Sequence, residues 1–151
     1  SDAQLWGLAV AALLCAYAVA IWYMVHYTPL LWPIALAEGF FLLAYNLEWF
    51  SARLHNDFWF AVSWGALPVL AGYVLQTNTV STAALLVAAA MALLSLVEIK
   101  ASRPYKELKR SMARGQDADR TQIAYLEAIL KSVSFGVILL GAGLLAWRLW
   151  S

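Results

Sequence analysis

Five apolar stretches dominate the chain, and each is long enough to cross a bilayer. They run over about residues 5–27, 30–50, 58–75, 80–97 and 132–150. A transmembrane helix needs ~20 mostly apolar residues, and it satisfies its backbone hydrogen bonds internally. With 13% charged residues, the chain falls far below the roughly 25% of soluble domains. The sequence therefore predicts an all-α integral membrane protein, a bundle of about five transmembrane helices in a single domain over residues 1–151.

The basic residues are concentrated between the fourth and fifth spans. Residues 98–131 hold eight of the ten Lys and Arg residues. By the positive-inside rule this segment, predicted as a loop, is cytoplasmic. The turn at 51–57 and the N-terminus then lie on the cytoplasmic side, and the C-terminus lies outside. The outer turns at 27–33 and 76–82 contain no Lys or Arg, as the rule requires. The predicted location is a bacterial inner membrane.

Part of the basic segment has the pattern of a surface helix. Four apolar residues follow helical spacing there: Ile123, Leu126, Ile129 and Leu130. Asp119 with Gln122 three residues later resembles a capping box. We expect an amphipathic helix on the cytoplasmic membrane surface that leads into the last span, with Pro104 and Gly115 as breakers before it. Membrane lipid is therefore an expected partner, and nucleic acid is not.

Glu38 is the most costly residue to place in a membrane. With a rise of ~1.5 Å per residue it lies roughly 13 Å below the outer end of the second span. An acid at that depth costs on the order of 3 kcal/mol and must face the bundle interior or a cavity. Tyr45, seven positions later on nearly the same helical face, would be a hydrogen-bond partner. Glu38 either contacts a substrate, a proton or a pigment, or is a neutral acid bonded to a neighbouring helix.

Metal-binding residues are few. His26 and His55 would be axial ligands of a haem or chlorophyll metal, although histidines near span ends also simply reach the interface. The predicted topology places them on opposite membrane faces, so one metal cannot bind both. The single cysteine, Cys15, has no partner for a disulfide. The sequence therefore predicts no metal site built from several side chains of this chain, and a single axial ligand, His26 or His55, stays the alternative.

The third span contains SWGALPVLAGY, residues 63–73, in which Gly65, Pro68 and Gly72 recur at spacings of three and four. They share one helical face. Small residues allow close approach of helices in lipid, and proline favours a kink. We expect this face to pack tightly against a neighbouring helix.

A polar segment, AYNLEWFSARLHNDFWF (residues 44–60), connects the second and third spans. Together with SWGALPVLAGY and the basic segment it resembles the UbiA-type intramembrane prenyltransferases, with Tyr45, Arg53 and Leu54 at matching positions. The resemblance implies that the five spans correspond to helices three to seven of a nine-helix bundle. It also implies a prenyl diphosphate donor, held through magnesium by two aspartate-rich motifs.

The second of these motifs is missing at its expected position. The sequence there reads SLVEIKASRPYKELKRS, with Glu98 and Glu107 as its only acids. Magnesium therefore enters only if acidic motifs are supplied from outside this chain. Arg103 and Lys106 would contact a diphosphate or an anionic lipid headgroup.

Two functions remain open. The chain is either a UbiA-like, degenerate or partial prenyltransferase that binds an isoprenoid lipid, or a non-catalytic subunit of a larger membrane complex that holds lipid, quinone or pigment. In both cases the same side chains are the candidate ligand contacts: Glu38, Tyr45, Asn46, Arg53, Asn56, Asp57, Arg103 and Lys106.

Overall fold

The computed structural model describes residues 2–47 and 53–150, and these residues form an all-helical bundle. In chain order its elements are α1 (Asp2–His26), the 3₁₀ turn η1 (Pro29–Leu31), α2 (Trp32–Asn46), α3 (Asp57–Ala61), the π-helical turn η2 (Val62–Ala66), α4 (Leu67–Thr77), α5 (Thr82–Ala113) and α6 (Arg120–Trp150). Five segments are long and apolar enough to cross a membrane: α1, η1 with α2, α3 through α4, α5 and α6. The predicted all-α membrane fold with five spans is confirmed. The predicted end of the second span at residue 50 lies outside the described residues.

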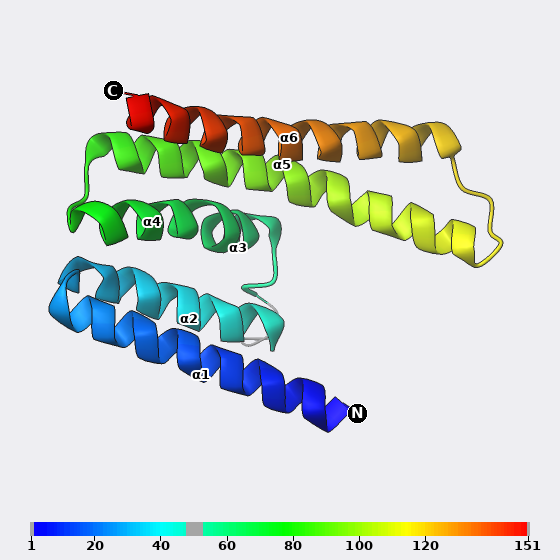
Figure 1. Cartoon of the computed structure of the whole chain (residues 1–151). Helices are drawn as coiled ribbons and strands as arrows, with labels where there is room; N and C mark the ends of the chain where they lie inside the picture. The colour runs from blue at the N-terminus through cyan, green and yellow to red at the C-terminus, as the bar shows by residue number, and fades with distance from the viewer. Residues whose placement is uncertain (1, 48–52, 151) are drawn as a thin grey trace.

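The helices lie side by side and alternate in direction (Figure 1). The N-terminus, the α2–α3 connection and the α5–α6 connection lie at one end, which we call the basic end. The α1–α2 connection, the α4–α5 connection and the C-terminus lie at the other end. Successive membrane spans must alternate in direction, as these helices do. The arrangement and the five apolar helices are those of a helical membrane protein. Its orientation in the membrane stays a prediction.

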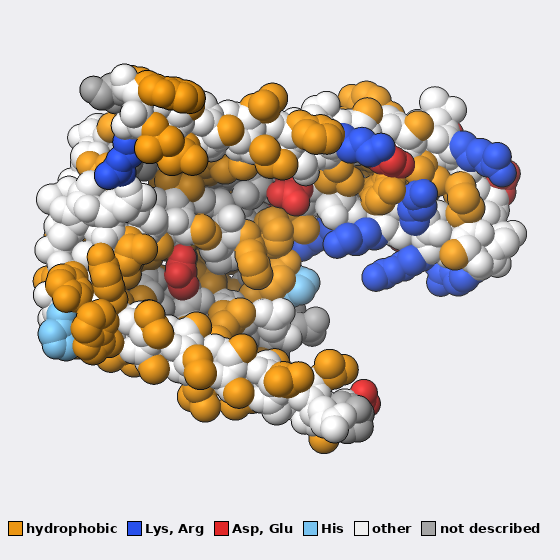
Figure 2. All heavy atoms as spheres, in the orientation of Figure 1, with side chains coloured by type: hydrophobic (Ala, Val, Ile, Leu, Met, Phe, Trp, Pro, Cys, Tyr) orange, Lys and Arg blue, Asp and Glu red, His pale blue; other side chains and the backbone are white. Residues whose placement is uncertain are grey.

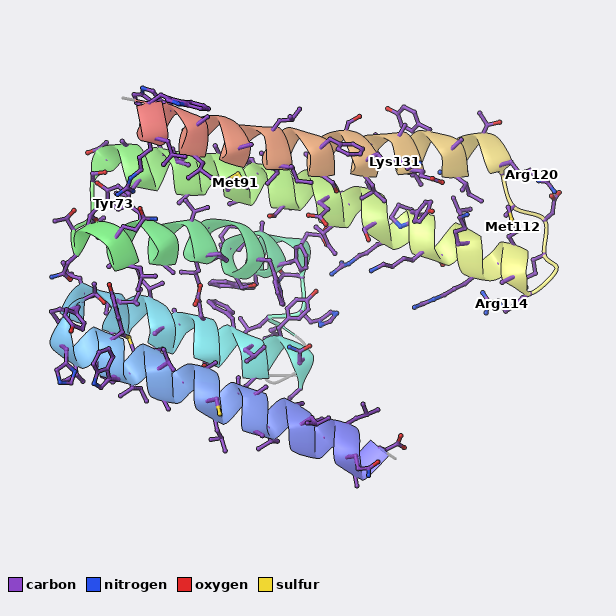
Figure 3. All side chains as sticks on the ribbon, in the orientation of Figure 1. Tyr73, Met91, Met112, Arg114, Arg120 and Lys131 are labelled. Atoms are coloured by element: carbon purple, nitrogen blue, oxygen red, sulfur yellow. The ribbon has the colours of Figure 1, made fainter. Side chains whose placement is uncertain are left out.

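The basic segment differs from its prediction as a loop. Helix α5 continues without interruption from the fourth span to Ala113, with Pro104 inside it. Proline removes one helical hydrogen bond, yet the surrounding residues are good helix formers and α6 packs alongside. The labelled residues Met112, Arg114 and Arg120 lie beyond the ends of the other helices (Figure 3). The two long helices thus extend as a hairpin from the basic end.

The predicted amphipathic helix is the first part of α6, and it is continuous with the last span. Its start at Asp119 is confirmed, because the carboxylate accepts hydrogen bonds from the backbone N–H groups of Thr121 and Gln122, at 2.8 and 3.2 Å. Its apolar residues Ile123 and Leu126 are buried, and α6 packs mainly on α5. The apolar face is therefore covered by α5 and does not form a separate helix on the membrane surface.

The third span packs closely on α5 at Gly65. A Cβ atom added at Gly65 would lie 2.8 Å from the Ala92 Cα atom and from the Met91 carbonyl oxygen. This confirms the predicted tight packing at this glycine. At Gly72 an added Cβ would meet nothing within 4 Å, so the same expectation is wrong there.

Candidate functional site

A pocket of about 400 Å³ lies between α1, α2 and the η2–α4 segment. Its walls are mostly small or aromatic: Ala16, Tyr17, Ala20, Ala35, Glu38, Phe41, Leu42, Ser63, Trp64 and Pro68. Towards the end of the bundle that lies opposite the basic end, Ala20 and Ala35 also pack on a core of Met24, Leu31 and Val74. The pocket is therefore closed by packed side chains on that side.

A second recess of about 320 Å³ shares Tyr17, Ala35 and Leu42 with the pocket. Its other walls come from α1 and α2 and are apolar apart from the glycine backbone: Leu13, Leu36, Gly39, Phe40 and Leu43. Both spaces border the contact between α1 and α2, where the three shared residues contribute to the walls of each. Both are mainly apolar.

Tyr17 reaches this site because Gly39 has no side chain. A Cβ atom added at Gly39 would lie 2.6 Å from the Tyr17 hydroxyl oxygen, closer than real Cβ contacts allow. The hydroxyl thus lies directly against the α2 backbone, one residue after Glu38. Glycine at this position fixes where the polar end of Tyr17 can lie.

The π-helical turn shapes the opposite wall. The Leu67 N–H bonds the Val62 carbonyl, five residues back, and Pro68 has no N–H to offer. One carbonyl of this turn, at Ser63 or Trp64, therefore lacks its usual helical donor. The Ser63 hydroxyl already donates to the Trp59 carbonyl, at 2.7 Å. Single π-helical turns inside α-helices are frequent at functional sites.

Glu38 lies near the middle of the second span and lines the pocket. Within the described residues it has neither a hydrogen bond nor an ion pair. The expected bond from Tyr45 is wrong, because the Tyr45 ring instead stacks on His55, with ring centroids 4.2 Å apart. An unpaired acid at this depth is costly, so a ligand with a polar group would stabilise it.

The polar residues at the basic end are mostly engaged in local structure. The Asn56 side chain caps α3 by accepting from the Trp59 N–H at 3.0 Å, and it donates to the Arg53 carbonyl at 2.8 Å. Asn46 donates to the Leu42 carbonyl in the last turn of α2, at 2.7 Å. These contacts explain why the connection contains amides.

Asp57 and Arg103 are the two predicted site residues that the fold joins across a long sequence distance. Their side chains form an ion pair, with 2.6 Å between the Arg103 Nη1 and Asp57 Oδ1 atoms. The pair ties the start of α3 to α5. Lys106 lies one turn further along α5 and is exposed. Lys and Arg side chains gather over the extended parts of α5 and α6 (Figure 2).

The two histidines lie at opposite ends of the bundle, as predicted. His26 ends α1 and its Nδ1 atom lies 2.7 Å from the Trp22 carbonyl oxygen. His55 precedes α3, with its Nδ1 atom 3.2 Å from the Tyr45 carbonyl oxygen. Among the described residues, no three His, Cys, Asp or Glu side chains lie close enough together to hold a metal ion.

Most residues that line the pocket were not predicted as ligand contacts from the sequence. Of its walls, only Glu38 was a candidate ligand contact, although Ser63, Trp64 and Pro68 lie in the SWGALPVLAGY segment. The serine and proline beside a glycine in one span were the available signal. Tyr17 carried no signal, because its role depends on its contact with Gly39 on another helix.

Comparisons with known proteins add no relative. No family model matches the chain, and neither a curated protein nor a solved structure matches it.

Proposed function

We propose that this helical membrane protein binds an isoprenoid lipid in the pocket beside Glu38. The observation that carries the proposal is the pocket itself, about 400 Å³, together with the apolar recess of about 320 Å³ that shares three of its wall residues. Small-molecule sites usually enclose ~300–1,000 Å³ and have mainly apolar and aromatic walls with a few polar groups. A prenyl chain is apolar and branched, so its methyl groups suit walls of alanine, leucine and phenylalanine.

We further infer that the chain is a divergent relative of the UbiA-type prenyltransferases. The support is the quoted resemblance, together with the position of its residues: Ser63, Trp64 and Pro68 border the pocket, and Tyr45 and Arg53 lie at the basic end. Among the described residues, no three His, Cys, Asp or Glu side chains form a group that could hold a metal ion.

A second candidate function is that of a non-catalytic subunit that holds a lipid, quinone or pigment within a larger membrane complex. Its support comes from α6, where no residue of the most apolar 18-residue stretch is buried within the described chain. That surface is open to lipid or to another subunit. Purification from native membranes separates the two functions, because stoichiometric co-isolation of other membrane subunits supports this one.

A photoreactive geranylgeranyl probe tests isoprenoid binding in lipid nanodiscs. The substitution Ala16→Leu places a larger side chain into the pocket from α1, so we expect it to reduce labelling at least about tenfold, equivalent to 1.4 kcal/mol. Ala18→Leu is the matched control, since Ala18 is also exposed on α1 but does not line the pocket. Its labelling should equal that of the wild type.

A photoreactive palmitate probe distinguishes isoprenoid binding from general contact with lipid. Equal labelling by both probes would refute the proposal, as would equal geranylgeranyl labelling of the Ala16→Leu and Ala18→Leu variants. Peptide mapping should place the crosslink on α1, α2 or the η2 turn.

A further inference from the structure

The pocket contains polar groups that need both a donor and an acceptor from a ligand. Glu38 has no partner among the described residues and can accept a hydrogen bond in either protonation state. One carbonyl of the η2 turn lacks its helical donor and can only accept. Tyr17 and Trp64 also line the space, and each brings a polar hydrogen that can be donated.

A hydroxyl group satisfies this arrangement better than a carbonyl group does. Its hydrogen can be donated to Glu38 or to the backbone carbonyl that lacks its helical donor, while its oxygen can accept from Tyr17 or Trp64. A ligand carbonyl can only accept, so it can pair with Tyr17, Trp64 or a protonated Glu38, but it cannot donate to the backbone carbonyl or to an ionised Glu38. An acceptor left unpaired in this way retains its full desolvation cost.

We propose that the head of the bound isoprenoid carries a hydroxyl group that donates a hydrogen bond to Glu38. This inference rests on the proposed isoprenoid binding and specifies the chemistry of the ligand. The hydroxyl lies beside Glu38, between α2 and the η2 turn, and the prenyl tail follows the apolar recess between α1 and α2. The head is either a quinol ring or the alcohol of a polyprenol.

Competition against the geranylgeranyl photoprobe in anaerobic nanodiscs tests the inference. One arm compares a quinol and its quinone, each with two isoprene units. The other arm compares geranylgeraniol with its methyl ether, which has no hydroxyl hydrogen. We expect the hydroxyl-bearing member of at least one pair to compete about tenfold better, as one additional hydrogen bond predicts.

Glu38→Gln identifies the residue responsible. The amide keeps the shape of the side chain but can donate as well as accept, so the preference should fall to about threefold or less. Glu98→Gln is the control, because Glu98 is exposed on α5 and does not line the pocket. It should keep the wild-type preference. Thermal unfolding of both variants should match the wild type, which separates loss of ligand from loss of fold.

The outcomes separate this inference from the proposed function. Preference in the quinol pair identifies a ring head, and preference in the alcohol pair identifies a polyprenol. If all four compounds compete but neither pair shows a preference, or if Glu38→Gln keeps the preference, the hydroxyl inference is refuted and isoprenoid binding stands. If none of the compounds competes and the photoprobe does not label the pocket, the proposed function fails as well.

Discussion

The two faces of the η2 turn pack in opposite ways. On one face, Gly65 brings the backbone of the third span against Ala92 of α5, without room for even one additional carbon atom. On the other face, Trp64 forms a wall of a pocket of about 400 Å³ towards α1 and α2. Pro68 of α4 contributes to the same wall, so its predicted place on the closely packed face of Gly65 is wrong. Residues one to three positions apart therefore produce close packing and open space within one turn.

The difference follows from side-chain size on the partner helices. Towards η2 and α4, helix α5 presents small residues at spacings of three and four: Ala84, Ala88, Ala92 and Ser95. Small residues permit close helix approach in lipid, where packing and hydrogen bonds stabilise the contact in place of the hydrophobic effect. On the pocket side, Phe41 and Trp64 are large and rigid. They cannot interdigitate as closely, and space remains beside Glu38.

The largest expected effect is that of Gly65→Ala. Its new Cβ atom would meet backbone atoms of α5, which cannot rotate away. We expect the free energy of unfolding to fall by about 1–3 kcal/mol, as for overpacked cores. Reversible unfolding in mixed SDS and detergent micelles, followed by tryptophan fluorescence, measures this change.

Gly72→Ala is the matched control on the same span, because its Cβ would meet nothing within 4 Å. It should unfold like the wild type or be slightly more stable, since alanine favours helices by up to about 1 kcal/mol. If Gly65→Ala and Gly72→Ala had the same stability, the close contact with α5 would be wrong.

Gly39→Ala should have a smaller effect on stability and should act on the pocket face. The three atoms nearest to its Cβ atom all belong to the hydroxyl end of Tyr17, which can move by side-chain rotation. We expect the free energy of unfolding to change by less than about 1 kcal/mol, because the displacement offsets the gain in helix propensity.

Labelling by the geranylgeranyl probe should nevertheless fall several-fold in this variant, since Tyr17 lines both spaces. Tyr17→Ala combined with Gly39→Ala tests the cause, because the second substitution then meets no hydroxyl. The double variant should therefore label like Tyr17→Ala alone. If Gly39→Ala reduced labelling as much in the Tyr17→Ala background as it does in the wild type, contact between the Gly39 Cβ and the Tyr17 hydroxyl would not be the cause.

The smallest effect on stability is expected for the ion pair between Asp57 at the start of α3 and Arg103 of α5. The Asp57 and Arg103 side chains are 32% and 44% exposed, so solvent weakens their attraction. A double-mutant cycle with Asp57→Ala and Arg103→Ala should give a coupling energy of ~0.2–1 kcal/mol, and less at high salt. Coupling that does not change with salt would argue against an ion pair.

The candidate site could be predicted from the sequence only in part. Glu38 was identified because an acid in an apolar span is expensive wherever the helix packs. Arg103 and Asp57 were both candidates, but nothing in the sequence paired them across 46 positions. The predicted Glu38–Tyr45 bond failed because Tyr45 lies at the basic end, where His55 supplies a ring on which it stacks.

The basic segment was the main error in the fold prediction. Pro104 and Gly115 were both expected to break helices, and Gly115 does lie in the turn after α5, with a φ angle of 73°. Pro104 does not break α5, because packing between α5 and α6 outweighs one missing hydrogen bond. The glycine therefore predicted the turn at Gly115 correctly, whereas the proline did not predict the end of a helix at Pro104.

The sequence by itself determined the all-α fold, the five spans and the helix start at Asp119. Each depends on local physics. The length of an apolar segment decides whether it can span the bilayer, and the first N–H groups of a helix need an acceptor close by in the sequence. Only the tertiary structure decided which glycine packs closely, where Tyr17 lies and what surrounds Glu38. These features depend on side-chain sizes of different helices at one level of the bundle, and no single segment contains that information.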